Sequence, residues 1–282
     1  MQTRASRAAD RRSFPSRGTG RASAFTLTEL LLIISIIAVL TSLLTSALNK
    51  TKARGHQITC LNNLRQLQVS WFLYSDDNEE QLALNRSESP MSSPPLLPIM
   101  GKRNSTNSWV VGNPKEDATT DNLKRGTLFP YVKSEAVYRC PSDFSTVFGL
   151  GKSKVRRTRS YSISSYMNGD ATGHNPRVKT RYSDLVSPSP DQTFVFIEEH
   201  KDTPWNGSFA VLPKVNTISL NAMVNEESTP SDRHFRGCGL SFADGHVEKW
   251  RWLAPKGFNL PSKHSVPERK DSARLQKAIP DP

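Results

Sequence analysis

The side chains best suited to chemistry lie toward the carboxyl end of the chain, where histidines and carboxylates occur close together. The candidates are His200, His234, Asp244, His246 and Glu248. Imidazole and carboxylate groups are the ligands of hydrolytic zinc sites, but the spacing here matches no fixed ligand motif. We therefore favour a structural interpretation, in which Asp244 orders its own turn and His234 hydrogen-bonds to a hairpin from across a sheet. We expect no metal centre and no cofactor.

Motifs for nucleophilic catalysis and phosphate binding do not occur in the sequence. There is no Gly-x-Ser-x-Gly elbow and no glycine-rich phosphate loop. Cys140 is followed by Pro141, which favours a packed or bridged thiol over a reactive one. We therefore expect the protein not to be an enzyme.

A basic run at residues 152–159, KSKVRRTR, could bind a nucleic-acid backbone, with Tyr161 and Tyr166 nearby for stacking. Such runs are more often solvated loops. The formal net charge of +12 is also less informative than it looks, because six arginines and one aspartate in the first 24 residues supply +5 of it. We favour the solvated loop and do not expect a nucleic-acid partner.

An uncharged apolar segment follows this basic leader. Residues 30–48 hold 19 residues without a charge, of which 14 are apolar. As a helix they would be about 28 Å long, close to the roughly 30 Å thickness of a hydrocarbon core. Positive charge before a first span holds that end in the cytoplasm. The sequence therefore predicts a leader at 1–24, a transmembrane segment at 25–48 and an extracytoplasmic head.

A secretory signal peptide cut near residues 45–47 is the alternative interpretation of this segment. Two features oppose it. The apolar run is longer than the usual 7 to 15 residues of such a peptide, and Glu29 stands at its start. A carboxylate facing lipid is costly unless a partner neutralises it. The segment is therefore better explained as an anchor in which Glu29 has a partner.

Beyond the membrane segment, apolar residues recur at spacings of three and four, which marks one stripe of a helix. The stripe consists of Ile58, Leu61, Leu64, Leu67, Trp71 and Tyr74. The pattern runs almost without a breaker from Phe25 to about Ser75 and ends at residues 76–78. We predict one helix of about 50 residues, roughly 75 Å long, whose amphipathic continuation over 49–80 packs on the head.

The head is predicted to occupy residues 81–261, with large loops and short strands. Residues 86–108 are rich in Ser, Pro and Asn and read as a loop, and 262–282 are predicted to be a disordered tail. Strands are predicted at 109–112, 161–167, 193–198, 208–212, 239–243 and 246–252. The last two form a hairpin, because Asp244-Gly245 suits a two-residue turn.

The start of the apolar segment carries a resemblance. Residues 24–34, AFTLTELLLII, closely resemble the prepilin signal of type IV pilins and type II secretion pseudopilins. The resemblance implies that prepilin peptidase cuts between Ala24 and Phe25 and that Phe25 is N-methylated. It also implies that Glu29 meets a terminal amine when subunits assemble, which would supply the cation that a carboxylate in lipid requires.

A second resemblance lies near the carboxyl end. His234, nine residues and then Asp244-Gly245, followed by His246, resembles the His-x9-Asp-Gly signature of a large group of pseudopilin-like proteins; segments at 60–67, 138–143, 159–162 and 241–246 agree with that group. The implied fold is α+β and pilin-like, with a long helix packed on an antiparallel sheet. Because some pseudopilins bind calcium in a carboxyl-terminal loop, Asp232 and Asp244 are candidate calcium ligands.

Three cysteines are too few for a disulfide scaffold. One bridge is permissible if the head lies outside the cytoplasm. We expect it between Cys60 and Cys140, because Cys238 sits in a turn-like Gly-Cys-Gly stretch.

Together these patterns predict a non-enzymatic structural subunit of a type II secretion or type IV pilus-like pseudopilus. Its partners would be prepilin peptidase, other pseudopilin subunits contacted through the helix, and the inner membrane, with the head in the periplasm. A monomeric membrane-anchored binding protein is the alternative. A metal-dependent envelope enzyme and a DNA-binding pilin are the less favoured hypotheses.

Overall fold

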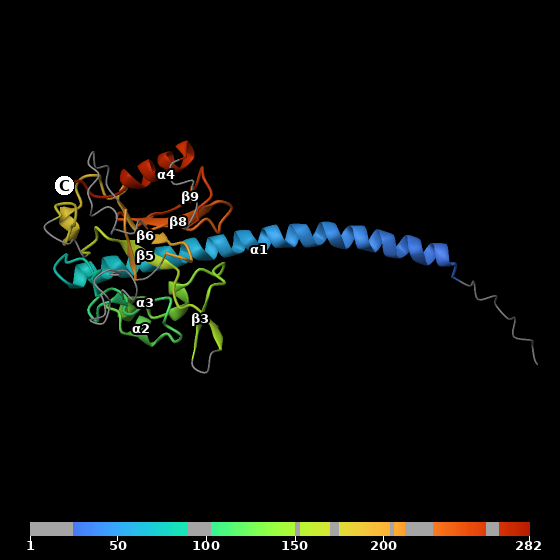
Figure 1. The fold of residues 1–282 in the computed structure, drawn as a ribbon, viewed down its shortest axis with the longest axis horizontal. Coiled ribbons are helices and arrows are strands. Elements are labelled where there is room, and N and C mark those ends of the chain that lie inside the picture. The colour runs from blue at the N-terminus through green and yellow to red at the C-terminus, as the bar shows by residue number, and fades with distance from the viewer. Residues whose placement is uncertain are drawn as a thin grey trace, which may run out of the picture. The chain divides into compact units, whose positions relative to one another are not determined.

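A computed structural model of the protein describes residues 25–88, 103–149, 153–169, 175–203, 206–211, 228–257 and 265–282 (Figure 1). The predicted leader at 1–24, including Ala24, lies outside the described residues, as do 89–102 of the predicted serine- and proline-rich loop. The chain divides into two compact units, Met1–Asn49 and Lys50–Pro282.

The longest element is the helix α1, Leu27–Asp77, of 51 residues. This confirms the predicted single helix. It ends where Glu79 and Glu80 adopt positive φ angles of 53° and 63°, a left-handed conformation that cannot continue an α-helix. The sequence leaves it unbroken up to that point because it contains no proline and only one glycine, Gly55.

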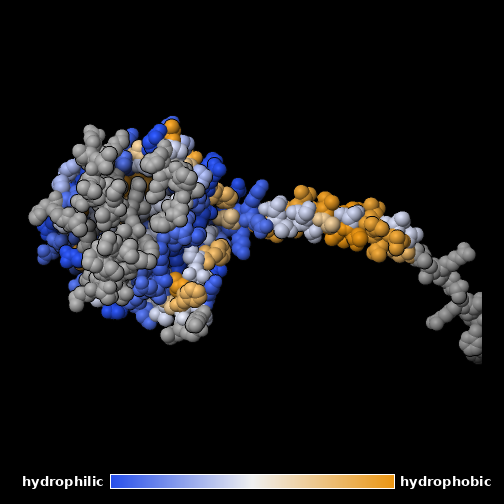
Figure 2. All heavy atoms as spheres, viewed as in Figure 1, coloured by the Kyte–Doolittle hydropathy of each residue, from blue (hydrophilic) through white to orange (hydrophobic). Residues whose placement is uncertain are grey.

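In the first unit every residue of α1 from 27 to 49 is exposed. Its mean hydropathy reaches 2.5 over an 18-residue window, so the helix is long and apolar enough to cross a membrane. Figure 2 shows the apolar side chains along this segment in orange.

In the second unit one face of α1 is buried and the opposite face is exposed. Leu64, Leu67 and Trp71 are fully buried, as the predicted stripe requires, whereas Ile58 is 67% exposed and does not belong to the buried face. Several polar residues join that face instead: Asn63, Gln68, Ser70 and Ser75.

The head is built on a five-stranded sheet with the order β7-β5-β6-β8-β9. Its strands are β5 (Tyr161–Ser164), β6 (Phe194–Glu198), β7 (Ser208–Phe209), β8 (Gly237–Phe242) and β9 (Val247–Arg251). All neighbouring strands are antiparallel except β5 and β7, which are parallel. The α+β class is therefore correct, but the sheet is mixed and not purely antiparallel.

Two small ribbons and several short helices complete the described part of the head. The ribbons pair β1 (Ser87–Glu88) with β2 (Arg103–Asn104) and β3 (Thr146–Phe148) with β4 (Lys154–Arg156). The helical elements are α2 (Asp121–Lys124), α3 (Phe129–Val132), η1 (Glu135–Tyr138), η3 (Tyr182–Asp184) and α4 (Val266–Gln276).

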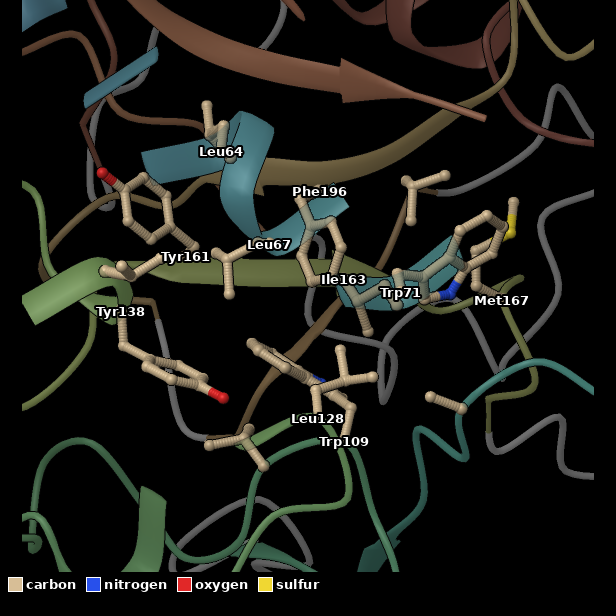
Figure 3. Close-up of a cluster of buried hydrophobic side chains, with 14 of the residues drawn as sticks. Leu64, Leu67, Trp71, Trp109, Leu128, Tyr138, Tyr161, Ile163, Met167 and Phe196 are labelled. Atoms are coloured by element: carbon tan, nitrogen blue, oxygen red, sulfur yellow. The ribbon is translucent and has the colours of Figure 1, made fainter. Parts of the chain in front are cut away.

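The sheet is covered on both faces, which explains why β6 and β8 are buried along their whole length. On one face, residues of α1 pack with Ile163 and Phe196, and with Trp109 beyond them (Figure 3). On the other face, Leu275, Ala278 and Ile279 of the carboxyl-terminal segment pack with residues from four of the strands.

The tail prediction is therefore wrong over 265–282, because α4 forms there and its end is buried. Ser265 accepts a hydrogen bond from the backbone N–H of Glu268 at 3.3 Å, and a proline stands in the first turn. A Ser-x-x-Glu pattern of this kind signals a helix start. The polar composition of this segment led to the prediction of disorder, although a few apolar contacts are enough to hold α4 on the sheet.

Two local predictions also need correction. Residues 109–112 form no strand; Trp109 instead packs flat against Tyr138, with ring centroids 6.1 Å apart. The turn between β8 and β9 has three residues, not two, since Phe242 N–H donates to His246 O and only Gly245 has a positive φ, of 98°. A three-residue hairpin needs just one left-handed position.

Candidate functional site

The start of α1 holds one carboxylate at the head of the apolar segment. Glu29 accepts hydrogen bonds from the backbone N–H and the hydroxyl of Thr26, at 2.9 and 2.8 Å, while Thr26 Oγ1 accepts one from the N–H of Glu29 at 3.2 Å. This reciprocal pair is a capping box, which satisfies backbone groups at a helix start. Glu29 thus has a partner within its own chain, Thr26, whereas the resemblance implies a terminal amine as its partner.

A second polar site lies in the interior of the head, between α1 and the sheet. Cys60 of α1, Cys140 after η1, Glu198 at the end of β6 and His234 before β8 are all buried. Their sulfur, oxygen and nitrogen atoms lie within 4.8 Å of one another. The structure thus brings Cys60 and Cys140 together as predicted, but as free thiols without the predicted disulfide.

The contacts inside this Cys60–Cys140–Glu198–His234 cluster are specific. Cys60 Sγ donates to Glu198 Oε2 at 3.4 Å, and His234 Nε2 lies 3.3 Å from both Cys140 Sγ and Glu198 Oε2. The His234 side chain therefore points to the cysteines and Glu198, and only the backbone N–H of His234 bonds to the hairpin, donating to Gly237 O at 3.0 Å.

Burial and pairing set the charges of the cluster. Burial opposes charge on His234, yet its contacts with Cys140 and Glu198 raise its pKa to about 9. Burial also raises the pKa of the Cys60 thiol well above its usual value. The pKa of Glu198 is held low despite full burial, because Arg233 and His234 face it. These contacts favour an anionic Glu198 carboxylate beside a cationic His234 imidazole.

Arg233 connects this cluster to a second buried carboxylate. Its Nε donates to Glu198 Oε1 at 2.8 Å, and its Nη1 lies 3.7 Å from Asp143 Oδ1. Asp143 also pairs with Arg157 and accepts a hydrogen bond from Ser160 at 2.6 Å. Each buried charge in this network faces an opposite one, which is the condition for keeping charges in a protein interior.

The hairpin residues lie elsewhere, on the surface. The backbone N–H of His246 donates to Asp244 Oδ1 at 3.1 Å, which confirms that Asp244 orders its own turn. His246 Nε2 lies 3.6 Å from Glu248 Oε1, with both side chains more than a third exposed. His246 also stacks on Phe242, with centroids 4.4 Å apart. These are contacts that stabilise the hairpin and its turn.

The remaining predicted ligands serve separate segments. His200 lies 3.6 Å from Asp202, and burial lowers its pKa. Asp232 accepts a hydrogen bond from the backbone N–H of Lys256 at 3.2 Å, so it braces a loop on its own and is not grouped with Asp244.

Only part of the basic run at 152–159 lies on the surface. Lys154 and Arg156 are exposed on β4, but Arg157 and Arg159 are buried and pair with Asp143 and Asp117. The prediction of a solvated loop is therefore wrong for two of its cations. Those two arginines are not available to a nucleic-acid backbone.

Sequence inspection missed Glu198 and did not connect His234 with the cysteines. The only signal was a charged residue, Glu198, ending an otherwise apolar strand, because such a residue must find a partner if the strand is central.

The described residues form an α+β protein with a helix of membrane-spanning length and a buried cysteine, histidine and glutamate cluster. No family model, curated protein or solved structure matches the chain.

Proposed function

We propose that the protein is a pilin-like, non-enzymatic structural subunit of a type II secretion or type IV pilus-like pseudopilus. It would be made with a basic leader, cut by prepilin peptidase between Ala24 and Phe25, and N-methylated at Phe25. The observation that carries the proposal is the wholly exposed apolar half of α1, which continues without a break into a helix that packs on a folded head.

The chemistry of this half-helix supports assembly as well as anchoring. Its polar residues bond to the helix itself: Thr41 donates to the carbonyl of Ile37 at 2.8 Å and Thr45 to that of Thr41 at 2.7 Å. Small and hydroxyl residues let helices approach closely in lipid, where apolar area alone gives no driving force. The segment therefore suits packing against copies of itself or related subunits.

Glu29 would set the register of that packing. Cleavage before Phe25 creates an amine four residues from Glu29, and a neighbouring subunit can present its own amine to this carboxylate. A carboxylate in lipid gains more from a cation than from the hydroxyl of Thr26. In this proposal the capping box is the form of the free subunit, and the amine replaces it on assembly.

The leader and the apolar half of α1 also indicate where the head is located. The arginines of the leader hold it in the cytoplasm, so the head emerges on the periplasmic side of the inner membrane. The proposed partners are prepilin peptidase and other pseudopilin subunits.

A monomeric, membrane-anchored extracytoplasmic binding protein is the second candidate. The capping box favours it, because Glu29 already has two donors from Thr26 and does not need a neighbour. In that case the prepilin-like segment would serve only for insertion and anchoring.

Crosslinking in intact cells distinguishes the two functions. A Ser42→Cys variant places a thiol on the exposed half-helix, while the three native cysteines are all buried. We expect disulfide-linked dimers and larger species from this variant, and their loss when Glu29→Ala is added.

Thr26→Ala is the matched control, because it removes the capping box but keeps the carboxylate. Assembly through Glu29 predicts that Thr26→Ala retains the crosslinks. Crosslinks that are absent from the start would reject assembly and leave the monomeric anchor, whereas crosslinks that persist in Glu29→Ala would reject the role of Glu29 in assembly.

A further inference from the structure

The buried Cys60–Cys140–Glu198–His234 cluster has no role in the proposed assembly, which depends on the other half of α1. Its four side chains come from four separate segments, and Cys60 and Glu198 are 138 residues apart in sequence. Each of the four is at most 2% exposed. Two thiols, an imidazole and a carboxylate thus converge at one buried point, and all four are groups that can bind a transition-metal ion.

The distances within the cluster fit a tetrahedral metal site. Zinc lies about 2.3 Å from sulfur and about 2.0 Å from nitrogen or oxygen, so adjacent ligand atoms in a tetrahedron are about 3.3 to 3.8 Å apart. Three of the six separations between ligand atoms are in this range: 3.4 Å from Cys60 to Glu198, 3.3 Å from Cys140 to His234 and 3.3 Å from His234 to Glu198. The other three are at most 4.8 Å, so side-chain movements would bring all four atoms to an ion at the centre.

Hydrogen bonds from surrounding residues hold the ligands in this orientation. Arg233 Nε binds Glu198 Oε1 at 2.8 Å, which leaves Oε2 facing the cluster. The hydroxyl of Tyr161 donates to Cys60 Sγ at 3.2 Å. The backbone N–H of Cys140 donates to Ser160 Oγ at 3.1 Å, and that hydroxyl donates to Asp143. Outer contacts of this kind fix ligand orientation in protein metal sites.

The charges also balance around a divalent ion. Metal binding displaces the protons of Cys60, Cys140 and His234. Two thiolates and the Glu198 carboxylate then carry three negative charges, the neutral His234 adds none, and the divalent ion with Arg233 supplies three positive charges. A neutral assembly avoids the penalty of a net charge in the interior.

The donor set selects the metal. Thiolate and imidazole ligands suit zinc, whereas calcium and magnesium prefer oxygen. With four protein ligands no coordination position is left for substrate or water, which is the pattern of a structural site and not of a catalytic one.

We propose that the head binds one zinc ion through Cys60, Cys140, Glu198 and His234, and that this ion fastens α1 to the sheet. This zinc centre is independent of whether the protein assembles or remains a monomeric anchor. It also gives His234 a role in the carboxyl-terminal motif, since Asp244 and Gly245 form the turn while His234 binds the metal.

The test is metal analysis of the full chain, purified in detergent under reducing conditions and equilibrated with Zn²⁺. We expect about one zinc per chain in the wild type and in Cys238→Ser, a matched variant that removes a buried thiol outside the cluster. Cys140→Ser and His234→Gln should lower the zinc content at least tenfold. Removal of zinc by a chelator should lower the melting temperature of the wild type, and added zinc should restore it.

Cobalt substitution in the wild type gives a readout that does not depend on variants that fold. Bound Co²⁺ should show thiolate-to-metal charge-transfer absorption and the visible bands of a tetrahedral ion. Two results would overturn the proposal: a reduced, folded wild-type chain that binds neither zinc nor cobalt, or a chain from cells whose mass and peptide map show a Cys60–Cys140 disulfide and no metal.

Discussion

The two halves of α1 belong to one helix but meet different surroundings. From 27 to 49 every side chain is exposed and apolar or hydroxylic apart from Glu29 and Asn49, whereas from Cys60 onward one face is buried. That buried face includes polar groups with partners outside the helix: Gln68 Oε1 accepts from Ser241 at 2.7 Å, and Asn63 Nδ2 donates to the carbonyl of Arg139 at 3.0 Å. In the apolar half, every hydroxyl from Ser35 to Ser46 donates to a carbonyl of its own helix, which is how a helix satisfies such groups in lipid.

The two halves differ in how they satisfy their polar groups. The apolar half satisfies them within the helix, as a segment suited to lipid does, whereas the other half pairs them with the head. Substitutions in the two halves should therefore differ in effect. All five tryptophans lie after residue 70, so tryptophan fluorescence of the full chain in detergent reports unfolding of the head alone.

The largest effect is expected at the buried charges of the head, which the apolar half lacks. Asp143→Asn leaves Arg157 buried without its carboxylate, since the two side chains are 2% and 1% exposed. Breaking a buried pair from one side costs about 3 to 5 kcal/mol. Denaturant unfolding should show this loss, and a loss below about 1 kcal/mol would contradict the pairing.

The same carboxylate gives a pH dependence. Burial disfavours its charge, but Arg157 and Arg233 outweigh burial and hold the pKa of Asp143 at about 2, below its ordinary 3.8. Because the folded pKa is the lower one, this stabilisation is complete above about pH 4 and is lost as pH falls toward 2. It amounts to about 2 kcal/mol. The Asp143→Asn variant should lack this component of acid destabilisation.

One substitution made in both halves tests the comparison directly. Leu64 is fully buried and Leu43 is 63% exposed on the same helix. Leu64→Ala should lower the free energy of unfolding by about 2 to 5 kcal/mol, because it leaves a cavity between α1 and the sheet. Leu43→Ala should change it by less than about 0.5 kcal/mol. Equal effects would show that α1 does not pack on the head as described.

A smaller effect is expected from adding a methyl group to β8 where it contacts α1. A Cβ at Gly239 would lie 2.5 Å from Leu64 Cδ1 and 3.2 Å from Leu61 Cδ2. Gly239→Ala should therefore destabilise the head by about 1 to 3 kcal/mol. Combining it with Leu64→Ala should relieve the clash, so the double variant should lose less than the sum of the two. Additive losses would argue against the contact.

The smallest effect has the opposite sign. Gly55 lies within α1, and a Cβ there would meet nothing within 4 Å. Gly55→Ala should stabilise the helix by about 0.5 to 1 kcal/mol through helix propensity. A higher midpoint of thermal unfolding is the expected result; a lower one would indicate a close neighbour at Gly55.

Local sequence patterns predicted the elements that are marked by an uninterrupted run of periodic apolar residues or by a turn motif. The end of α1 near Ser75, and the strands that became β6, β8 and β9, follow from periodicity and from Asp244-Gly245. Residues 109–112 resemble a strand in sequence because Trp109 and the two valines are apolar. A buried loop also requires apolar residues, so composition does not distinguish the two.

The candidate site could be predicted only in part, because its residues meet through the fold. Cys60 and His234 are brought together by the packing of α1 on the sheet, and nothing in their spacing states that contact. Cys count and spacing predict a Cys60–Cys140 disulfide, because they do not show that His234 and Glu198 lie beside the two thiols. The helix α4 was missed although Ser265 and Glu268 mark its start.

The most direct test of the proposed function is the mass of the mature amino terminus, measured on protein isolated from its own membranes. The account predicts a chain that begins with N-methylated Phe25 and keeps Glu29 and the whole apolar half of α1. A chain that begins after Ala47, or one that retains residues 1–24, would contradict it.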